Sequence, residues 1–292
     1  MLLQIIMTGI LLGGIYAVIS IGLSLIFGVM RIINFAHGEF LMISMYGAFW
    51  AFQYFHLHPY VSAVVIVPIA FIIGALIYKA LIHPAMKRSA SVVVLATVGL
   101  SLVLQNMALF LWKSDFRTVP VPIAGMNVQI GSIYIPLSSL VAFVVASLIT
   151  VVLWMFLNKT QIGRSIRATT QDKQAAQLMG INVQKTFLLT FGLGSALVAV
   201  GGSLITPIFT IFPALGVNMV MICFVIVVLG GLGSIPGAWL GGIIIGLIDA
   251  IAGYYFSAEI KQILFFVIFI AIMIVKPAGL LGVKGSEEVG LK

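Results

Sequence analysis

Residues 5–28 read IIMTGILLGGIYAVISIGLSLIFG, an apolar run without a charged side chain. The hydrocarbon core of a membrane needs about 20 apolar residues for one helical crossing, so this run is long enough to span it. Gly9 and Gly13 stand four residues apart in the run, a spacing that lets two helix backbones approach closely in lipid. The stretch therefore predicts a membrane-spanning helix that packs tightly against another helix.

The rest of the chain has the same character. Of its 292 residues, 62% are hydrophobic and 8% are charged, whereas about 25% are charged in an ordinary soluble domain. Apolar runs lie near 5–28, 40–55, 60–78, 91–112, 134–157, 187–211, 217–232, 237–256 and 262–276. Because these runs lack the alternation of barrel strands, we expect one all-α, polytopic membrane domain over residues 1–292, with about eight to ten transmembrane helices.

The positions of the basic residues predict the orientation. The formal net charge is +8, but its basic side chains lie in loops between apolar runs, which favours contact with anionic lipid over nucleic acid. The basic segments are 79–90, the tail after 275, and residues 158–186, hereafter the polar loop. Cytoplasmic loops are enriched in Lys and Arg. We therefore expect these three segments and the C-terminus inside, and the N-terminus outside.

The sequence lacks the motifs of the common hydrolases and metal sites. His37 and Glu39 form H-G-E and not the H-E-x-x-H of a zinc helix, so we expect no metal site. There is no G-x-S-x-G elbow and no G-x-x-x-x-G-K-[ST] phosphate loop. The single cysteine, Cys223, cannot form an intrachain disulfide. These observations argue against an enzyme, and any energy taken from ATP must come from another chain.

Three features inside the apolar regions leave alternatives open. The segment RIINFAHGEF (31–40) is either an interfacial turn anchored by Arg31 or a polar break that lines a route for a solute. The segment GGLGSIPGAWLGG (230–242) must interrupt a helix, either in a tight turn or beside a cavity. Asp249, an acid well inside an apolar run, either stabilises the bundle interior or lines a path.

The polar loop contains signals for a short helix. Thr169 and Asp172 match the start of a helix, and Gly180 is typical of a helix stop. We therefore expect a helix of about ten residues over 170–179, whose small and apolar residues form an exposed surface for membrane or protein. These residues are Ala175, Ala176, Leu178 and Met179.

Several motifs resemble a known family of transporters. QAAQLMG (174–180) resembles the cytoplasmic Glu-Ala-Ala-x-x-x-Gly loop of ABC importer permeases, with Gln174 in place of the glutamate. Together with that loop, GVMRIINFAHGEFLM (28–42), GRSIRATTQDKQAAQLMGINV (163–183) and GGLGSIPGAWLGG (230–242) resemble the permease subunits of branched-chain amino-acid importers, the LivH-type subunits most closely. The resemblance covers nearly the whole chain in order.

This resemblance implies a single permease domain in the plasma (inner) membrane of a bacterium or archaeon. The implied complex adds a second related permease, two cytoplasmic ATPases and an extracytoplasmic solute-binding protein, and the ATPases hold ATP and magnesium, so that this chain needs no cofactor. ATPase coupling would fall to Arg164, Arg167, Asp172, Gln174, Ala175, Ala176 and Gly180, and the translocation path to Asn34, His37, Glu39 and Asp249. Branched-chain amino acids are the expected substrates, with other amino acids, urea and short amides as alternatives.

A second hypothesis is an ion-coupled secondary transporter or channel that works without an ATPase. Such proteins favour intramembrane charges or an inverted repeat around a midplane site. The sequence offers Asp249 as one clear intramembrane acid and no visible repeat. An integral membrane enzyme is a third hypothesis, for which the sequence shows no catalytic constellation.

Overall fold

The computed structural model of the protein describes residues 2–282 except 132, 257 and 277. In chain order the elements are α1 (Leu2–Met30), α2 (His37–Phe55), α3 (Pro59–Ile77), the π-helical turn η1 (Tyr78–Ile82), α4 (His83–Met86), α5 (Ala90–Trp112), the 3-10 turn η2 (Pro122–Gly125), β1 (Asn127–Ile130), β2 (Ile133–Pro136), α6 (Leu137–Lys159), α7 (Gln161–Gln171), α8 (Lys173–Leu178), α9 (Val183–Ile205), α10 (Leu215–Gly230), α11 (Ile235–Tyr255) and α12 (Ala258–Val275). Each of the nine predicted apolar runs contains a helix, although the run 134–157 begins in β2 and the run 187–211 continues past the end of α9.

The helices confirm the polytopic, all-α class. In the described part of the chain, six helices are long and apolar enough to cross a membrane: α1, α3 continued through η1 and α4, α5, α6, α9 and α11. The other three apolar runs form α2, α10 and α12, which do not meet both conditions over the residues described. The count of eight to ten crossings therefore stays a prediction.

The bundle is assembled around α1, which packs against α11, α9, α6 and α10. A Cβ atom added to Gly13 would lie 2.8 Å from the Gly242 carbonyl oxygen, and one on Gly22 would lie 2.7 Å from the Gly194 carbonyl oxygen. These contacts are between backbones, so only glycine fits there. The predicted role of the glycines, close approach of helices in lipid, is confirmed at these positions.

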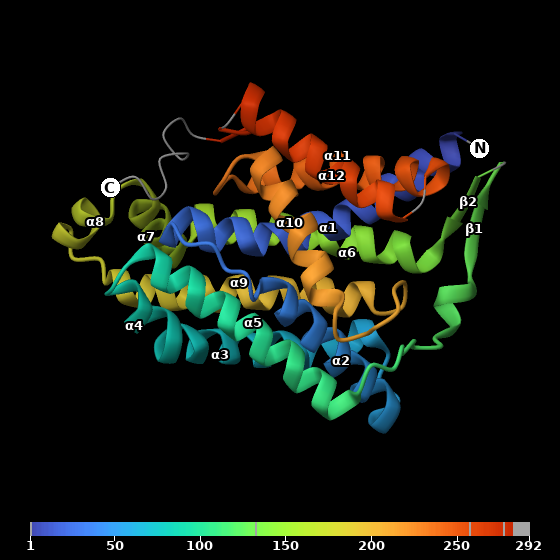
Figure 1. Ribbon diagram of the computed structural model, residues 1–292, viewed down its shortest axis with the longest axis horizontal. Coiled ribbons are helices and arrows are strands. Elements are labelled where there is room, and N and C mark those ends of the chain that lie inside the picture. The colour runs from blue at the N-terminus through green and yellow to red at the C-terminus, as the bar shows by residue number, and fades with distance from the viewer. Residues whose placement is uncertain (1, 132, 257, 277, 283–292) are drawn as a thin grey trace.

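The molecule has two distinct ends (Figure 1). At one end, β1 and β2 form an antiparallel hairpin in which Asn127 faces Pro136 and Ile130 faces Ile133, beside the start of α1. At the other end lie α4 and the two helices of the polar loop, α7 and α8. The described basic segments 79–90 and 158–186 thus share an end, opposite the hairpin, as the predicted topology requires. We call these the hairpin end and the polar-loop end.

Two helices begin inside the bundle instead of at its ends. After α1 the chain runs back, and His37, the first residue of α2, contacts the carbonyl oxygen of Ile19 near the middle of α1. Gly38 in turn touches Gly216 in the first turn of α10. The first turns of α2 and α10 therefore meet within the protein.

The interruption at 230–242 is a tight turn. Ser234 N–H donates to the Gly231 carbonyl at 3.0 Å, and Gly231 and Gly233 adopt φ values of +104° and +84°. A Cβ on Gly28, near the end of α1, would lie 2.8 Å from Gly233 Cα. The turn therefore lies against the polar-loop end of α1, and the tight-turn interpretation of this segment is the one the structure supports.

Candidate functional site

The polar loop folds as two helices, and the helix expected over 170–179 is confirmed over Lys173–Leu178, with a start three residues later than expected. α7 ends at Gln171, and Asp172 takes an extended conformation with φ −151° and ψ 112°. Its Oδ1 accepts hydrogen bonds from Gln174 N–H at 2.8 Å and Ala175 N–H at 2.9 Å. A carboxylate that satisfies the first N–H groups of a new helix competes with continuation of the old one. Asp172 therefore divides the loop and caps α8.

The helix stop at Gly180 is confirmed. Gly180 has φ +81°, a left-handed conformation that glycine adopts most easily. Its N–H donates to Gln177 O at 3.0 Å, and Ile181 N–H donates to Ala176 O at 3.0 Å. These bonds satisfy carbonyl groups that the end of α8 leaves open. A Cβ on Gly180 would meet nothing described within 4 Å, so backbone conformation and not space requires this glycine.

The surface of α8 differs from the expected one at a single position. Ala176 is buried, with 4% of its surface exposed, because it faces back toward the protein. Ala175 and Gln174 are exposed, and Leu178 and Met179 are 88% and 82% exposed. Ala175, Leu178 and Met179 stand at helical spacing on one side. The apolar surface offered at the tip of the polar loop is therefore made by these three residues and not by Ala176.

α7 attaches the tip firmly to the bundle. Its buried residues Gly163, Ile166 and Thr169 recur every third position, and α7 packs against α6, α9 and α1. In the next helix, the Lys173 ammonium lies 5.6 Å from the ring centre of Phe187 in α9. Movement of α8 would therefore be passed to three helices of the bundle.

The two predicted arginines of the loop have different surroundings. Arg167 donates hydrogen bonds to the side-chain and backbone oxygens of Asn158, in the last turn of α6. Cations near a helix C-terminus are stabilised by its free carbonyls. Arg164 lies one turn earlier with an exposed side chain. Arg167 thus supports the α6–α7 corner, whereas the Arg164 side chain makes no hydrogen bond or ion pair with the described residues.

A second group of predicted residues is buried where α2 begins. Asn34, His37 and Glu39 are each at most 1% exposed. His37 Nε2 lies 2.9 Å from the Ile19 carbonyl oxygen. A carbonyl oxygen can only accept, so Nε2 carries the hydrogen. The interfacial-turn interpretation of 31–40 therefore fails for these three side chains, and only Arg31 is exposed.

Glu39 lies between two other helices. Its Oε1 accepts a hydrogen bond from the Ser101 hydroxyl of α5 at 3.2 Å. A Cβ on Gly216 would lie 2.6 Å from the Glu39 carboxyl carbon, which places this carboxyl against the first turn of α10. Helix N-termini stabilise negative charge because their N–H groups are unpaired and the helix dipole is positive there. The first turn of α10 thus lies beside this carboxyl group, although its Oε2 accepts no hydrogen bond from the described residues.

Asp249 belongs to a different cluster. Its Oδ2 accepts a hydrogen bond from the Tyr16 hydroxyl at 3.3 Å, and its Oδ1 lies 2.5 Å from Lys261 Nζ. Asp249 is 3% exposed, so this ion pair ties α11 to α12 inside the protein. Lys261 was not predicted as a site residue because it falls between the expected apolar runs 237–256 and 262–276, whereas α12 begins at Ala258. The available signal was that Lys261 directly precedes the apolar run that follows the one containing Asp249.

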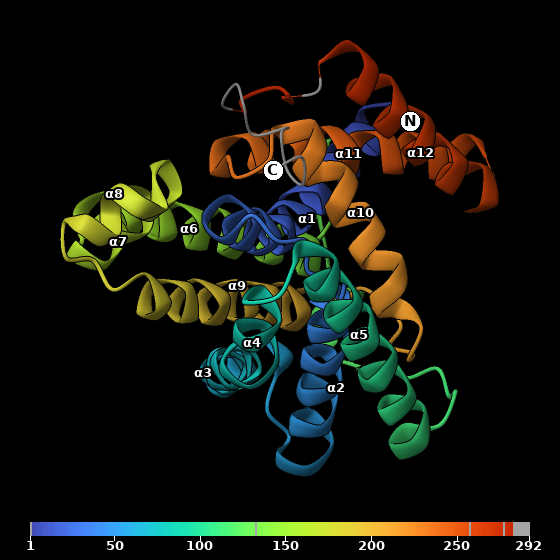
Figure 2. The ribbon, with the colours of Figure 1, turned by 60° about the vertical axis from the view of Figure 1, so that its left-hand side comes forward.

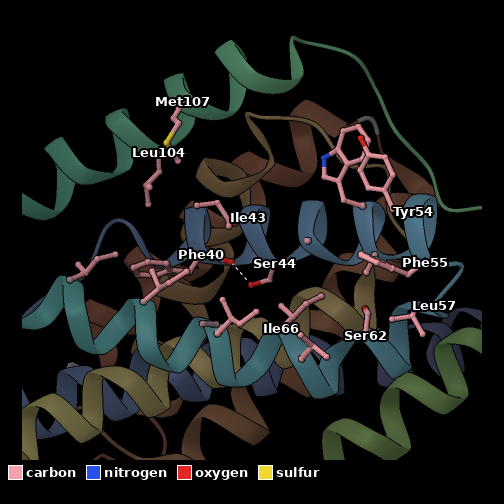
Figure 3. Close-up of a pocket in the computed structure, with 18 residues that line it drawn as sticks. Phe40, Ile43, Ser44, Tyr54, Phe55, Leu57, Ser62, Ile66, Leu104 and Met107 are labelled. Atoms are coloured by element: carbon pink, nitrogen blue, oxygen red, sulfur yellow. Dashed lines mark hydrogen bonds between the residues drawn. The ribbon is translucent and has the colours of Figure 1, made fainter.

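A cavity of about 660 Å³ lies between α2, α3 and α5 (Figure 3). Its lining is almost wholly apolar. Ser44 donates to Phe40 O and Ser62 donates to Pro59 O, each at 2.7 Å, so these hydroxyls serve their own helices. Such a surface suits hydrocarbon chains and offers little to a charged solute. The cavity is therefore a poor candidate for a polar substrate.

Comparisons with known proteins give one consistent result. Residues 5–273 match the family described as "Branched-chain amino acid transport system / permease component". The chain is 32% identical to the high-affinity branched-chain amino acid transport system permease protein LivH of Escherichia coli (strain K12), over 98% of this chain and 97% of that protein. The corresponding protein BraD of Pseudomonas aeruginosa is 31% identical over 98% of both chains.

The likeness extends to an archaeal protein. The probable branched-chain amino acid transport permease protein LivH of Methanocaldococcus jannaschii is 30% identical over 92% of this chain and 89% of its own length. No solved structure matches the chain.

Proposed function

Since this chain belongs to the family of branched-chain amino acid transport permeases, we propose that it is the membrane permease subunit of an ATP-driven importer of branched-chain amino acids. The full-length likeness to relatives named for this transport carries the proposal. Six helices capable of crossing a membrane agree with a multi-pass protein of the inner membrane. The whole chain is one permease domain, with the polar loop as its coupling element.

The partners follow from what an importer needs and this chain does not supply. Its sequence has no phosphate-binding loop, so two cytoplasmic ATPases bind ATP and magnesium. A second related permease completes the path, and an extracytoplasmic binding protein delivers the substrate. Nucleic acid has no part in this scheme.

Coupling would pass through α8. An ATPase surface covers the exposed Ala175, Leu178 and Met179, while Arg164 and Gln174 supply polar contacts beside them. Asp172 and Gly180 fix the two ends of α8. When ATP closes the ATPases, the tip moves with them and α7 carries the displacement to α1, α6 and α9. A rigid element engaged differently in two states is the requirement for such coupling.

The test introduces bulk into this surface. Ala175→Trp should weaken binding of the ATPases in detergent pull-downs and lower leucine uptake, because Ala175 is exposed where the partner must approach. Gly180→Val should act similarly by straining the left-handed residue. Gly125, in the η2 turn just before β1 and with no described atom within 4 Å of an added Cβ, provides the control as Gly125→Val.

Two outcomes would contradict the proposal. Normal ATPase binding with full uptake in both loop variants would remove α8 from the coupling interface. Uptake that continues without ATP and collapses with an ionophore would favour the ion-coupled transporter instead.

A further inference from the structure

A groove lies between α10 and α12, which pack against each other at an angle; Figure 2 shows both ribbons on the right. The groove consists of two cavities of about 260 and 190 Å³. Met221, Val225 and Phe266 line both, so the cavities adjoin and form one channel-like surface, hereafter the α10–α12 groove. None of the predicted path residues except Asn34 lines it.

The larger cavity carries a cation. Lys261 lines it together with the amides of Asn218 and Gln262. The lysine side chain is 30% exposed, while its partner Asp249 is 4% exposed and lies behind it. An ammonium group has three N–H donors, and the ion pair with Asp249 occupies one side of it. The remaining donors are available to a ligand in the groove.

An unpaired donor lies behind the apolar wall of the smaller cavity. Asn34 lines it and is fully buried. Its Oδ1 accepts from Ala36 N–H at 3.2 Å, but its Nδ2 has no hydrogen-bond partner among the described residues. Buried polar groups are nearly always paired, so this amide is an unusual donor, but it lies behind the apolar wall of the cavity and is not open to it.

The order of these groups along the groove fits a solute that has a carboxylate at one end and an apolar body. Lys261 lies in the first turn of α12, which begins at Ala258. The cavity that Asn34 lines is also lined by Leu23, in the second half of α1. Between the two polar positions the walls are the apolar Met221, Val225 and Phe266. A carboxylate attached to a branched apolar body matches a cation followed by an apolar wall.

We infer that the α10–α12 groove is the part of the substrate path formed by this subunit, with Lys261 binding the substrate α-carboxylate. This inference rests on the proposed function. Met221, Val225 and Phe266 contact the branched side chain. Asp249 is a positioning residue, because it touches Lys261 and not the substrate.

The test uses the complete transporter in liposomes of phosphatidylcholine, with ATP-driven leucine uptake as the readout. Lys261→Met should lower uptake by roughly tenfold or more, the loss expected for a hydrogen bond to a charged group, and Lys261→Arg should keep most of it. Lys113, an exposed lysine at the end of α5, gives the control Lys113→Met, which should leave uptake unchanged. Failure of the wild-type complex to import leucine would instead refute the proposed function.

A double variant separates recognition from folding. Lys261→Met alone leaves Asp249 buried without its partner, which destabilises proteins. Lys261→Met with Asp249→Asn removes both charges and should restore thermal stability in detergent while uptake stays low. Recovery of uptake in the double variant would show that the pair is only structural and would overturn the inference.

Cysteine labelling tests the route itself. Cys223 is the single cysteine, so Cys223→Ala gives a clean background. In the assembled transporter, Met221→Cys should react with a charged, water-soluble thiol reagent, and leucine should slow the reaction. Val152→Cys, on an exposed apolar face of α6, should not react. Equal labelling at both positions, or wild-type uptake that rises only when anionic lipid is added, would overturn the inference, the latter because Lys261 would then serve a lipid headgroup.

Discussion

α1 and α5 are both long apolar helices able to cross a membrane, yet they occupy opposite environments. In the most apolar stretch of α1, 89% of the residues are buried within the protein, against 22% in α5. α5 touches the bundle through a narrow stripe of Val93, Thr97, Leu104 and Ala108. The difference lies in the small residues, because α1 presents glycines to neighbouring backbones whereas Gly99 of α5 faces open space. Hydropathy predicts that both segments are membrane-spanning helices. The glycine spacing indicates which of the two is buried within the protein.

The largest effect should come from placing the same side chain on both helices. Gly13→Leu meets backbone atoms of Gly242 and Ile243 at 2.8 Å, which cannot move without separating α1 from α11. We expect the free energy of unfolding to fall by about 3 kcal/mol. Gly99→Leu has no described atom within 4 Å of its Cβ and should leave it unchanged or slightly higher. Urea unfolding in detergent micelles measures both, and equal losses would refute the comparison.

A smaller effect is expected within α2, which has both kinds of glycine. A Cβ on Gly38 would lie 2.7 Å from the Gly216 carbonyl carbon, whereas one on Gly47 would be 3.6 Å from Ile66. Gly38→Ala should therefore separate the first turns of α2 and α10 at a cost of about 1–2 kcal/mol and lower leucine uptake. Gly47→Ala should transport normally. If the two variants transport alike, the meeting of α2 and α10 is not required for function.

For α5, local signals should matter more than contacts with the bundle. Ser89 caps this helix, its hydroxyl accepting from Val92 N–H at 3.3 Å. Ser89→Ala should destabilise the first turn by about 1 kcal/mol, seen as faster amide hydrogen exchange at the start of α5. Ser89→Asn keeps an acceptor and should behave as wild type. Unchanged exchange in Ser89→Ala would mean that the bundle, and not the cap, fixes this end.

The smallest effect concerns α3, which is also mainly exposed. His58 Nδ1 accepts from Tyr60 N–H at 3.3 Å at the start of this helix, and burial lowers the pKa of His58 below its usual value. A protonated Nδ1 cannot accept. The contribution of this cap is therefore fully present above the usual histidine pKa of about 6.5 and is lost as the pH falls through the lowered value.

Hydrogen exchange at the start of α3 should thus quicken at acidic pH relative to neighbouring helices, by an amount equivalent to less than about 1 kcal/mol. His58→Asn keeps the acceptor without a titrating ring and should remove the pH dependence. Persistence of the same dependence in that variant would exclude His58 as its source.

The features that local sequence determines were predicted well. All nine apolar runs contain a helix, because length and hydropathy decide that property residue by residue. Gly180 ends α8, since a left-handed stop depends on one residue. The close approach of Gly13 to α11 was also expected, although its partner could not be named.

The features that depend on tertiary contacts were not predicted. The sequence does not reveal that α2 begins beside Ile19, because that contact joins residues 18 positions apart across a reversal of the chain. The division of the polar loop was missed because Asp172 ends one helix and caps the next, and the sequence does not show which of these it does. Ala176 was expected on the surface, and only the packing of α8 shows that it is buried. The ion-pair partner of Asp249 could be predicted only from the way α11 packs against α12.

The burial of α1 also sets an order of events during synthesis. α1 is made first, but its glycine partner Gly242 follows Gly13 by 229 residues. At roughly 5–20 residues per second, the ribosome needs about 10–45 seconds to reach it. During that interval the glycine surface of the first helix faces lipid or the insertion machinery. The packing of α1 is therefore completed only after α11, in the last third of the chain, has been made.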